Sequence, residues 1–217
     1  MENKFQCAIF DLDGVIVNTV PLHFRAWKKL FEEYGKKFDF QDYLEKVDGI
    51  PRIAGTKAIL TDLQEDKIVI ASDKKQKYFM KFLRELEIPV FNSTVKLIKN
   101  LKSRKLKLAV VSSSKNCSYI IKKAGLNKLF DTAFTGNDII KGKPDPQIFL
   151  TTAERLKVKP GNCVVFEDAI LGVEAAKRAK MKCVGIDRLG KPERLKKADL
   201  IVKDLKELNF NTLQSLF

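Results

Sequence analysis

Five short apolar runs, rich in Val, Ile and Ala, constrain the fold of this chain more than any other feature. They lie at residues 7–10, 106–111, 163–166, 183–186 and 200–202. Apolar residues at helical spacing occupy several of the segments between them, at 94–103, 118–124, 146–156 and 170–179. Strands that alternate with helices and are apolar on both faces form parallel sheets covered by helices on both sides. The sequence therefore predicts an α/β fold with a Rossmann-like parallel sheet core.

The stretch between the first and second apolar runs has a different pattern. Its apolar residues recur at helical spacing around 23–34 and 78–86, and no convincing strand pattern occurs. We expect a mostly helical cap domain at 19–89, inserted after the first strand, and a discontinuous core domain made of 1–18 and 90–217. An insertion that leaves a strand end carrying reactive groups is well placed to act as a lid.

Polar side chains follow three of the predicted strands. Asp11 and Asp13 end the first run, Ser112 follows the second, and Glu167 and Asp168 follow the third. Residues i and i+2 of an extended chain project to the same side, so the first two carboxylates point together. An ordinary acidic turn would also explain D-x-D-G taken alone. Because ligands of parallel sheets bind beyond the carboxyl ends of the strands, we expect these groups to share one cleft.

The chemistry of such a cleft follows from its charges. Carboxylates that lie close together repel, and a cation or a raised pKa must offset that repulsion. Oxygen ligands suit Mg2+. The hydroxyl-rich turn at 112–116 favours anions at the start of the next helix, and Lys143 precedes a helix start marked by proline. Hydroxyl, lysine and metal together suit a phosphoryl group, whose transfer depends on positioning and charge neutralisation.

Four ordered motifs give the chain a family resemblance. F-D-L-D-G-V-I, V-V-S-S-S-K-N, G-K-P-D-P and F-E-D-A-x-x-G occur in this order over nearly the whole chain. They resemble the motifs of the haloacid dehalogenase superfamily, in its D-x-D-G phosphotransferase branch. The resemblance implies that Asp11 is a nucleophile that forms an aspartyl phosphate, and that Asp13 is the general acid and base. It also implies that Ser112 and Lys143 bind the phosphoryl oxygens.

The same resemblance implies a set of Mg2+ ligands. The Asp11 carboxylate, the backbone carbonyl of Asp13 and the Asp168 carboxylate would hold the ion, and Glu167 would ligate it directly or through water. A true dehalogenase uses no metal and lacks the second aspartate. Phosphonate hydrolysis would require a Schiff-base lysine in the cap, which the sequence does not identify.

Two stretches of the cap narrow the resemblance to the beta-phosphoglucomutase-like subfamily. They are N-T-x-x-x-H-F-R-A-W at 18–27 and V-D-G-I-P-R at 47–52. The likeness implies that Arg52 binds the non-transferring phosphate with its bidentate fork and that His23 sits at the cap hinge near Asp13. Lys75 is the best match to a lysine that partners the histidine, although spacing allows Lys74 equally.

The serine-lysine-asparagine loop extends this likeness, and two positions depart from it. By resemblance, three neighbouring residues would contact substrate from the core side: Ser114, Lys115 and Asn116. Asn18 stands where these mutases usually carry Asp, and residues 53–56 lack the acidic and serine residues typical of the subfamily's cap. These departures put the exact sugar in doubt and leave the core chemistry unaffected.

The net charge of +14 raises the question of nucleic acid. The lysines interleave with apolar residues at helical spacing, as on solvated faces of amphipathic helices, and no nucleic-acid motif appears. No apolar run reaches the length of a membrane span and no signal peptide is apparent, so we expect a cytoplasmic protein. We also expect a monomer that acts on a small-molecule sugar phosphate.

The sequence is compatible with three functions. The first is a mutase that interconverts beta-glucose 1-phosphate and glucose 6-phosphate, and the second is a sugar-phosphate phosphatase with the same core residues. The third, a non-catalytic basic binding protein on this scaffold, is disfavoured by the intact set of catalytic side chains.

Overall fold

The computed structural model describes residues 4–47, 51–138 and 140–217. The chain divides into two compact units, one made of residues 1–18 and 88–217 and the other of residues 19–87. We call them the core unit and the cap unit and describe each by itself.

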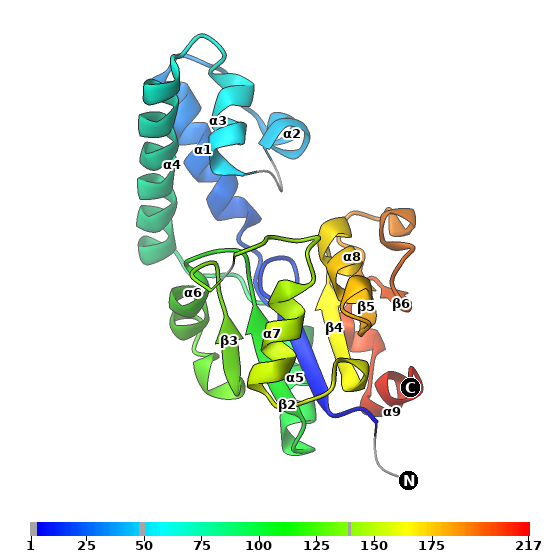
Figure 1. Ribbon diagram of the computed structural model, residues 1–217. Helices are drawn as coiled ribbons and strands as arrows, with labels where there is room; N and C mark the ends of the chain where they lie inside the picture. Colours follow the sequence, from blue (N-terminus) through cyan, green and yellow to red (C-terminus); the bar gives the residue numbers. More distant parts are fainter. Residues whose placement is uncertain (1–3, 48–50, 139) are drawn as a thin grey trace. The chain divides into compact units, whose positions relative to one another are not determined.

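The core unit is built on a parallel sheet of six strands in the order β3-β2-β1-β4-β5-β6 (Figure 1). The central strand β1 pairs in parallel with β2 on one side and β4 on the other. Four of the strands are buried along nearly their whole length, as expected for a sheet covered on both faces. The strands are β1 (Cys7–Asp11), β2 (Lys107–Val111), β3 (Thr132–Phe134), β4 (Cys163–Glu167), β5 (Lys182–Ile186) and β6 (Leu200–Val202).

The predicted fold class is confirmed, and the sequence pattern missed one strand. The five apolar runs coincide with β1, β2, β4, β5 and β6. Strand β3 has only three residues, and Thr132 and Ala133 are half-buried in it. It pairs with β2 alone at one edge of the sheet. A strand this short shows no period, so only its pairing with β2 reveals it.

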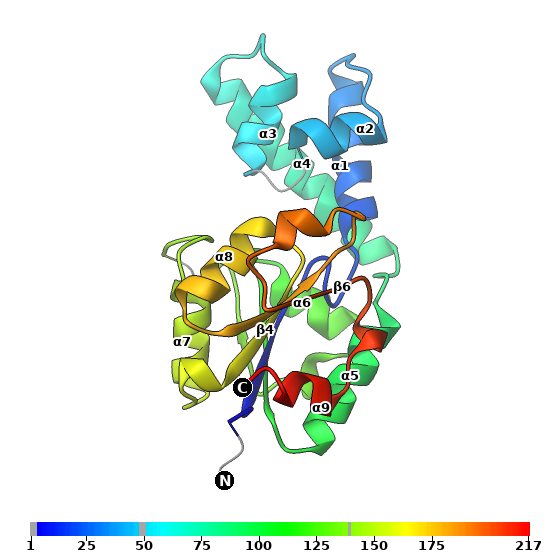
Figure 2. The same cartoon turned by 90° about the vertical axis from the view of Figure 1, so that its right-hand side faces the viewer.

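Helices cover both faces of this sheet. The two figures place α7 and α8 on one face and α5 and α9 on the other (Figures 1 and 2). Ile9, Val111 and Val165 from the strands join Phe149 and Val173 from α7 and α8 in one buried cluster. The helices of this unit are α5 (Asn92–Ser103), α6 (Cys117–Lys123), α7 (Gln147–Arg155), α8 (Ile170–Arg178) and α9 (Phe210–Gln214), with 3-10 turns at Asn127–Leu129, Pro160–Asn162, Pro192–Leu195 and Leu205–Glu207.

The cap unit consists of helices joined by turns, and its described residues include no named strand. Its elements are α1 (Val20–Glu33), α2 (Phe40–Asp42), a π-helical turn at Tyr43–Val47, α3 (Arg52–Ile59) and α4 (Glu65–Glu85). Its buried cluster is rich in aromatic residues, among them Trp27, Phe31 and Phe38. Gly55 packs against the Trp27 ring, since a Cβ at this position would lie 3.0 Å from a ring atom.

None of the helices in the described parts of the chain is both long and apolar enough to cross a membrane.

Candidate active site

The register of the sheet brings three strand ends together in the core unit. Asp11 on β1 pairs with Val111 on β2, the residue before Ser112. Phe10 on β1 pairs with Phe166 on β4, the residue before Glu167. Because the strands are parallel, the polar residues that follow them lie at one edge of the sheet.

Lys143 joins this edge from the loop before α7. Its Nζ lies 2.5 Å from Asp11 Oδ1 and forms a second ion pair with Glu167. All three groups are nearly removed from water: the exposed fractions of the side chains are 12% for Lys143, 10% for Asp11 and 0% for Glu167. Buried ions of this kind persist only when they are paired.

The pKa values of Asp11 and Lys143 are both raised, for different physical reasons. Burial raises the pKa of Asp11 well above its ordinary value, and Glu167, Asp168 and Asp13 add to that rise while Lys143 opposes it. Burial by itself would lower the pKa of Lys143, but the carboxylates of Asp11 and Glu167 raise it above its ordinary value. The lysine therefore stays charged and holds the Asp11 carboxylate in place.

Asp168 is the second acid at the end of β4. Burial raises its pKa to about 7, with a further contribution from Glu167. Its carboxylate lies directly against Gly14, where a Cβ would sit 1.9 Å from Asp168 Oδ2 and where the backbone has a φ of +76°. Gly172 likewise leaves space for the Glu167 carboxylate, since a Cβ there would lie 2.0 Å from Glu167 Oε1. The glycines of the first and fourth motifs thus make room for carboxylates.

The loop after β2 places one hydroxyl in the cluster. Ser112 is buried, and its Oγ lies 3.5 Å from Asp13 Oδ2. Ser112 Oγ also accepts a hydrogen bond from Ser114 N, and Ser114 Oγ accepts one from Asn116 N. The Ser114 hydroxyl therefore shapes its own loop.

In the cap unit, His23 and Lys75 form a buried pair. Lys75 Nζ lies 2.9 Å from His23 Nδ1 and 4.7 Å from the centre of the Trp27 ring, and the His23 ring stacks on Phe79 with centroids 4.1 Å apart. Burial lowers the pKa of His23 well below its ordinary value, with help from Lys75. Burial, and then the charge of Arg52, lowers the pKa of Lys75 to about 7.

The other cap candidates lie near the surface. Lys74 pairs with Glu33 Oε2 at 2.5 Å rather than with His23. Arg52 begins α3 and donates from Nη2 to Asp73 Oδ1 at 2.9 Å. Residues 48–50 of the V-D-G-I-P-R motif lie outside the described residues.

Arg188 is a site residue that the sequence reasoning missed. It follows β5, and its Nε donates to the backbone carbonyl of Gly14 at 2.8 Å. Its guanidinium lies 3.7 Å from the centre of the Phe91 ring and 4.0 Å from Asp204 Oδ2. The rule that found the other candidates, a polar residue just beyond a predicted strand, would also have found this one.

The donors at this end of the sheet are oxygens, the type of ligand that a small divalent cation prefers. Among the described residues, no group of three or more His, Cys, Asp or Glu side chains is arranged to hold a metal ion. The Glu167 carboxylate is already engaged, because it forms an ion pair with Lys143 and accepts hydrogen bonds from the backbone N–H groups of Asp168 and Ala169. The remaining donors are oxygens, with raised pKa values at Asp11 and Asp168. Burial raises these two pKa values most and the neighbouring carboxylates raise them further, and a bound Mg2+ would offset both effects.

A parallel sheet with acids and a lysine gathered at its strand ends defines an α/β enzyme core. Residues 8–186 match the family model described as haloacid dehalogenase-like hydrolase. The chain belongs to this family, as its motifs predicted.

Two curated relatives show the range of activities near this chain. The beta-phosphoglucomutase of Bacillus subtilis is 32% identical over 96% of this chain and 93% of its own length. The phosphorylated carbohydrates phosphatase of Thermotoga maritima is 34% identical over 85% of this chain and 83% of its own length. Among solved structures, beta-phosphoglucomutase from Clostridium difficile superposes with a TM-score of 0.83 at 32% identity, covering 98% of this chain and 96% of that one.

Proposed function

We propose that this protein is a Mg2+-dependent phosphotransferase that acts on sugar phosphates through an aspartyl phosphate on Asp11, and that it is a beta-phosphoglucomutase. The observation that carries the proposal is the buried Asp11 carboxylate at the end of β1, held 2.5 Å from Lys143 Nζ. The similarity to the Bacillus subtilis mutase over nearly the full length of both chains supports the choice of reaction.

The core residues have distinct roles in this proposal. An Asp11 oxygen attacks phosphorus, and the bond from phosphorus to the sugar oxygen breaks. Asp13 donates a proton to that leaving oxygen and takes a proton from the hydroxyl that attacks in the reverse step. Ser112 and Lys143 bind the phosphoryl oxygens, and Lys143 also orients Asp11. The bound Mg2+ supplies neutralisation of the phosphoryl and carboxylate charges.

The metal ligands we propose combine side chains and backbone. Asp11, Asp168 and the backbone carbonyl of Asp13 hold the ion, and Glu167 supports them directly or through water. Because one of these donors is a carbonyl and Glu167 is paired with Lys143, the set does not require three free carboxylates.

The cap unit and the serine-lysine-asparagine loop recognise the substrate in this proposal. Arg52 exchanges its ion pair with Asp73 for the non-transferring phosphate, which a bidentate guanidinium binds well. His23 lies at the cap hinge in this proposal, and Lys75 is the lysine that partners it. The loop contributes three further contacts to the sugar phosphate: Ser114, Lys115 and Asn116.

A sugar-phosphate phosphatase is the second candidate, favoured by the Thermotoga maritima relative and by a core that both reactions share. The two functions differ in the fate of the phosphate on Asp11. A mutase returns it to a sugar hydroxyl, whereas a phosphatase lets water take it.

The deciding experiment incubates the protein with Mg2+, beta-glucose 1-phosphate and a trace of glucose 1,6-bisphosphate. Accumulation of glucose 6-phosphate supports the mutase, and accumulation of inorganic phosphate selects the phosphatase. Asp11→Asn is the control, because the amide is a poor nucleophile and both activities should vanish. Retained turnover in this variant would refute the role of Asp11.

The third candidate, a non-catalytic binding protein, has a separate signature. Such a protein would retain nucleic acid at physiological salt and would show neither mutase nor phosphatase activity.

A further inference from the structure

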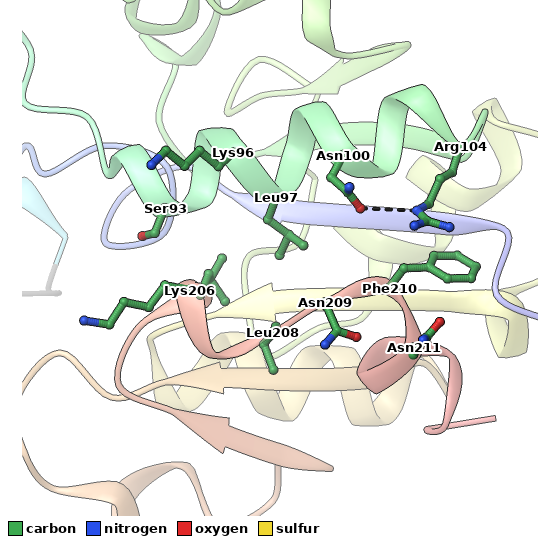
Figure 3. Close-up of a pocket in the computed structure, with 11 residues that line it drawn as sticks. Ser93, Lys96, Leu97, Asn100, Arg104, Lys206, Leu208, Asn209, Phe210 and Asn211 are labelled. Atoms are coloured by element: carbon green, nitrogen blue, oxygen red, sulfur yellow. Dashed lines mark hydrogen bonds between the residues drawn. The ribbon is translucent and has the colours of Figure 1, made fainter.

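The core unit carries a groove that the proposed chemistry does not use. It lies between α5 and the C-terminal segment 205–211, with a volume of about 550 Å³ (Figure 3). Cavities of this size hold small organic ligands. The α5 wall consists of Ser93, Lys96, Leu97 and Asn100, with Arg104 just after the helix, and this spacing places them on a single face.

The lining is positively charged. Lys96 and Lys206 lie on opposite walls at the same end of the groove, and Arg104 lies at the other end (Figure 3). No Asp or Glu lines it. In the described part of the chain, neither lysine ammonium takes part in an ion pair within 4.0 Å. Apart from the longer-range attraction between Lys206 and Asp204, these ammonium groups are therefore open to a ligand with negative charge.

The acids beside the lining, Asp204 and Glu207, are bound mainly by backbone N–H groups. Glu207 Oε1 accepts from the backbone N–H groups of Lys203 and Asp204. Asp204 Oδ1 accepts from the backbone N–H of Lys206, and Asp204 Oδ2 faces Arg188. Asp204 also accepts a hydrogen bond from the Ser93 side chain and attracts Lys206, so it offsets part of the positive charge at this end of the groove, whereas Glu207 is engaged by the backbone.

The amide side chains of the groove offer donors more than acceptors. Asn100 Oδ1 accepts from Arg104 Nε at 3.3 Å, and Asn209 Oδ1 accepts from the backbone N–H of Thr212 at 3.0 Å. These bonds fix each amide with its oxygen occupied and its NH2 group available. A lining rich in N–H donors selects a ligand rich in oxygen acceptors.

The centre of the groove is apolar. Leu97 and Leu208 are buried and lie between the two charged ends (Figure 3). The Phe210 ring stacks on Phe5 and also contacts the Arg104 guanidinium. The floor therefore accommodates the body of a small molecule by van der Waals contact with the two leucines.

We propose that this groove is a second binding site, separate from the strand-end cluster, for a small organic phosphate monoester. The phosphate lies between Lys96 and Lys206, and the body of the ligand lies over Leu97 and Leu208, within reach of the asparagine amides. The proposal depends on the groove alone and holds whichever reaction the Asp11 site performs.

The test follows backbone and asparagine side-chain amide resonances of the protein during separate titrations with glucose 6-phosphate, AMP and inorganic phosphate. Saturable shifts at Leu97, Asn100 and Asn209 report the groove, and shifts at 112–116 report the Asp11 site independently. Saturation by either ester supports the proposal and shows whether a sugar or a nucleoside phosphate is preferred. Inorganic phosphate that binds the groove as tightly as both esters would overturn it, because only an adventitious anion site would remain.

Charge reversal provides the matched comparison. Lys96→Glu with Lys206→Glu should weaken ester binding at the groove at least about tenfold, the scale of losing charge-assisted hydrogen bonds. Lys99→Glu with Lys203→Glu changes the net charge equally at exposed lysines outside the lining and should leave that affinity within about twofold. Equal weakening in both variants, or no groove shift with any probe, refutes the site. If the double glutamate variant does not fold, Lys96→Ala with Lys206→Ala gives the same comparison.

Discussion

Replacement of Lys75 by Met should make the protein more stable near neutral pH and change how its stability depends on pH. Lys75 is 4% exposed, and its amine lies above the rings of Trp27 and Phe79 within 2.9 Å of His23 Nδ1. Met matches the unbranched shape of the lysine and removes its charge. His23 is the only histidine of the chain, and its lowered pKa keeps it neutral in this pH range.

The magnitude follows from the lowered pKa of Lys75. The folded protein releases the proton at about pH 7, whereas the unfolded chain holds it up to about 10.5. Between these values the unfolded state binds more protons, so the wild-type stability rises with pH through this window. At about 1.4 kcal/mol for each pH unit, the full span corresponds to on the order of 5 kcal/mol. From pH 7 to pH 9, the wild type should gain about 2 kcal/mol relative to Lys75→Met.

The assay is urea unfolding at pH 7, 8 and 9, in which the free energy of unfolding of the wild type is compared with that of each variant. Lys74→Met is the matched control, because Lys74 is a neighbour on α4 that is exposed and paired with Glu33. Pairing raises the pKa of Lys74, so its charge persists across the window and the control difference should not change with pH. A difference in the free energy of unfolding between the wild type and Lys75→Met that stays constant from pH 7 to 9 would show that Lys75 is not desolvated as described.

Two further substitutions probe the turn after β1. Thr94→Val removes a buried hydrogen bond of 2.7 Å from Thr94 Oγ1 to the Val15 carbonyl. We expect the free energy of unfolding, measured in urea, to fall by about 1–3 kcal/mol. A loss below about 0.3 kcal/mol would contradict this expectation. Gly14→Ala drives a Cβ into Asp168 and should abolish turnover. Gly125→Ala is the control, because Gly125 has a similar φ of +71° and a Cβ there would meet no atom within 4 Å beyond its chain neighbours, so this change should lower stability and leave activity intact. Equal activity in the two variants would remove Asp168 from the proposed site.

The sequence predicted most of the core fold because the strands are continuous apolar runs. Strand β4, for example, is a run of buried residues that ends at Glu167, and its polarity changes sharply at the sheet edge. Strand β3 was not predicted, because it has only three residues, two of them half-buried, and such a segment resembles a loop until its pairing with β2 is known. The motifs likewise showed which residue types follow each strand, and the similarity to known family members confirms the class they predicted.

The partner of each charged side chain could not be determined from the sequence. Lys74 and Lys75 are adjacent and chemically identical, yet one pairs with Glu33 at the surface and the other lies buried against His23. Arg188 reaches the Gly14 carbonyl across 174 residues of chain, and the donor-rich groove exists only where α5 lies beside the C-terminal segment. The amino-acid order thus determined the elements and the chemistry available at their ends, because periodicity and polarity are local. Tertiary packing alone decided burial, charge pairing and the resulting pKa values, because these depend on distances between residues remote in the chain.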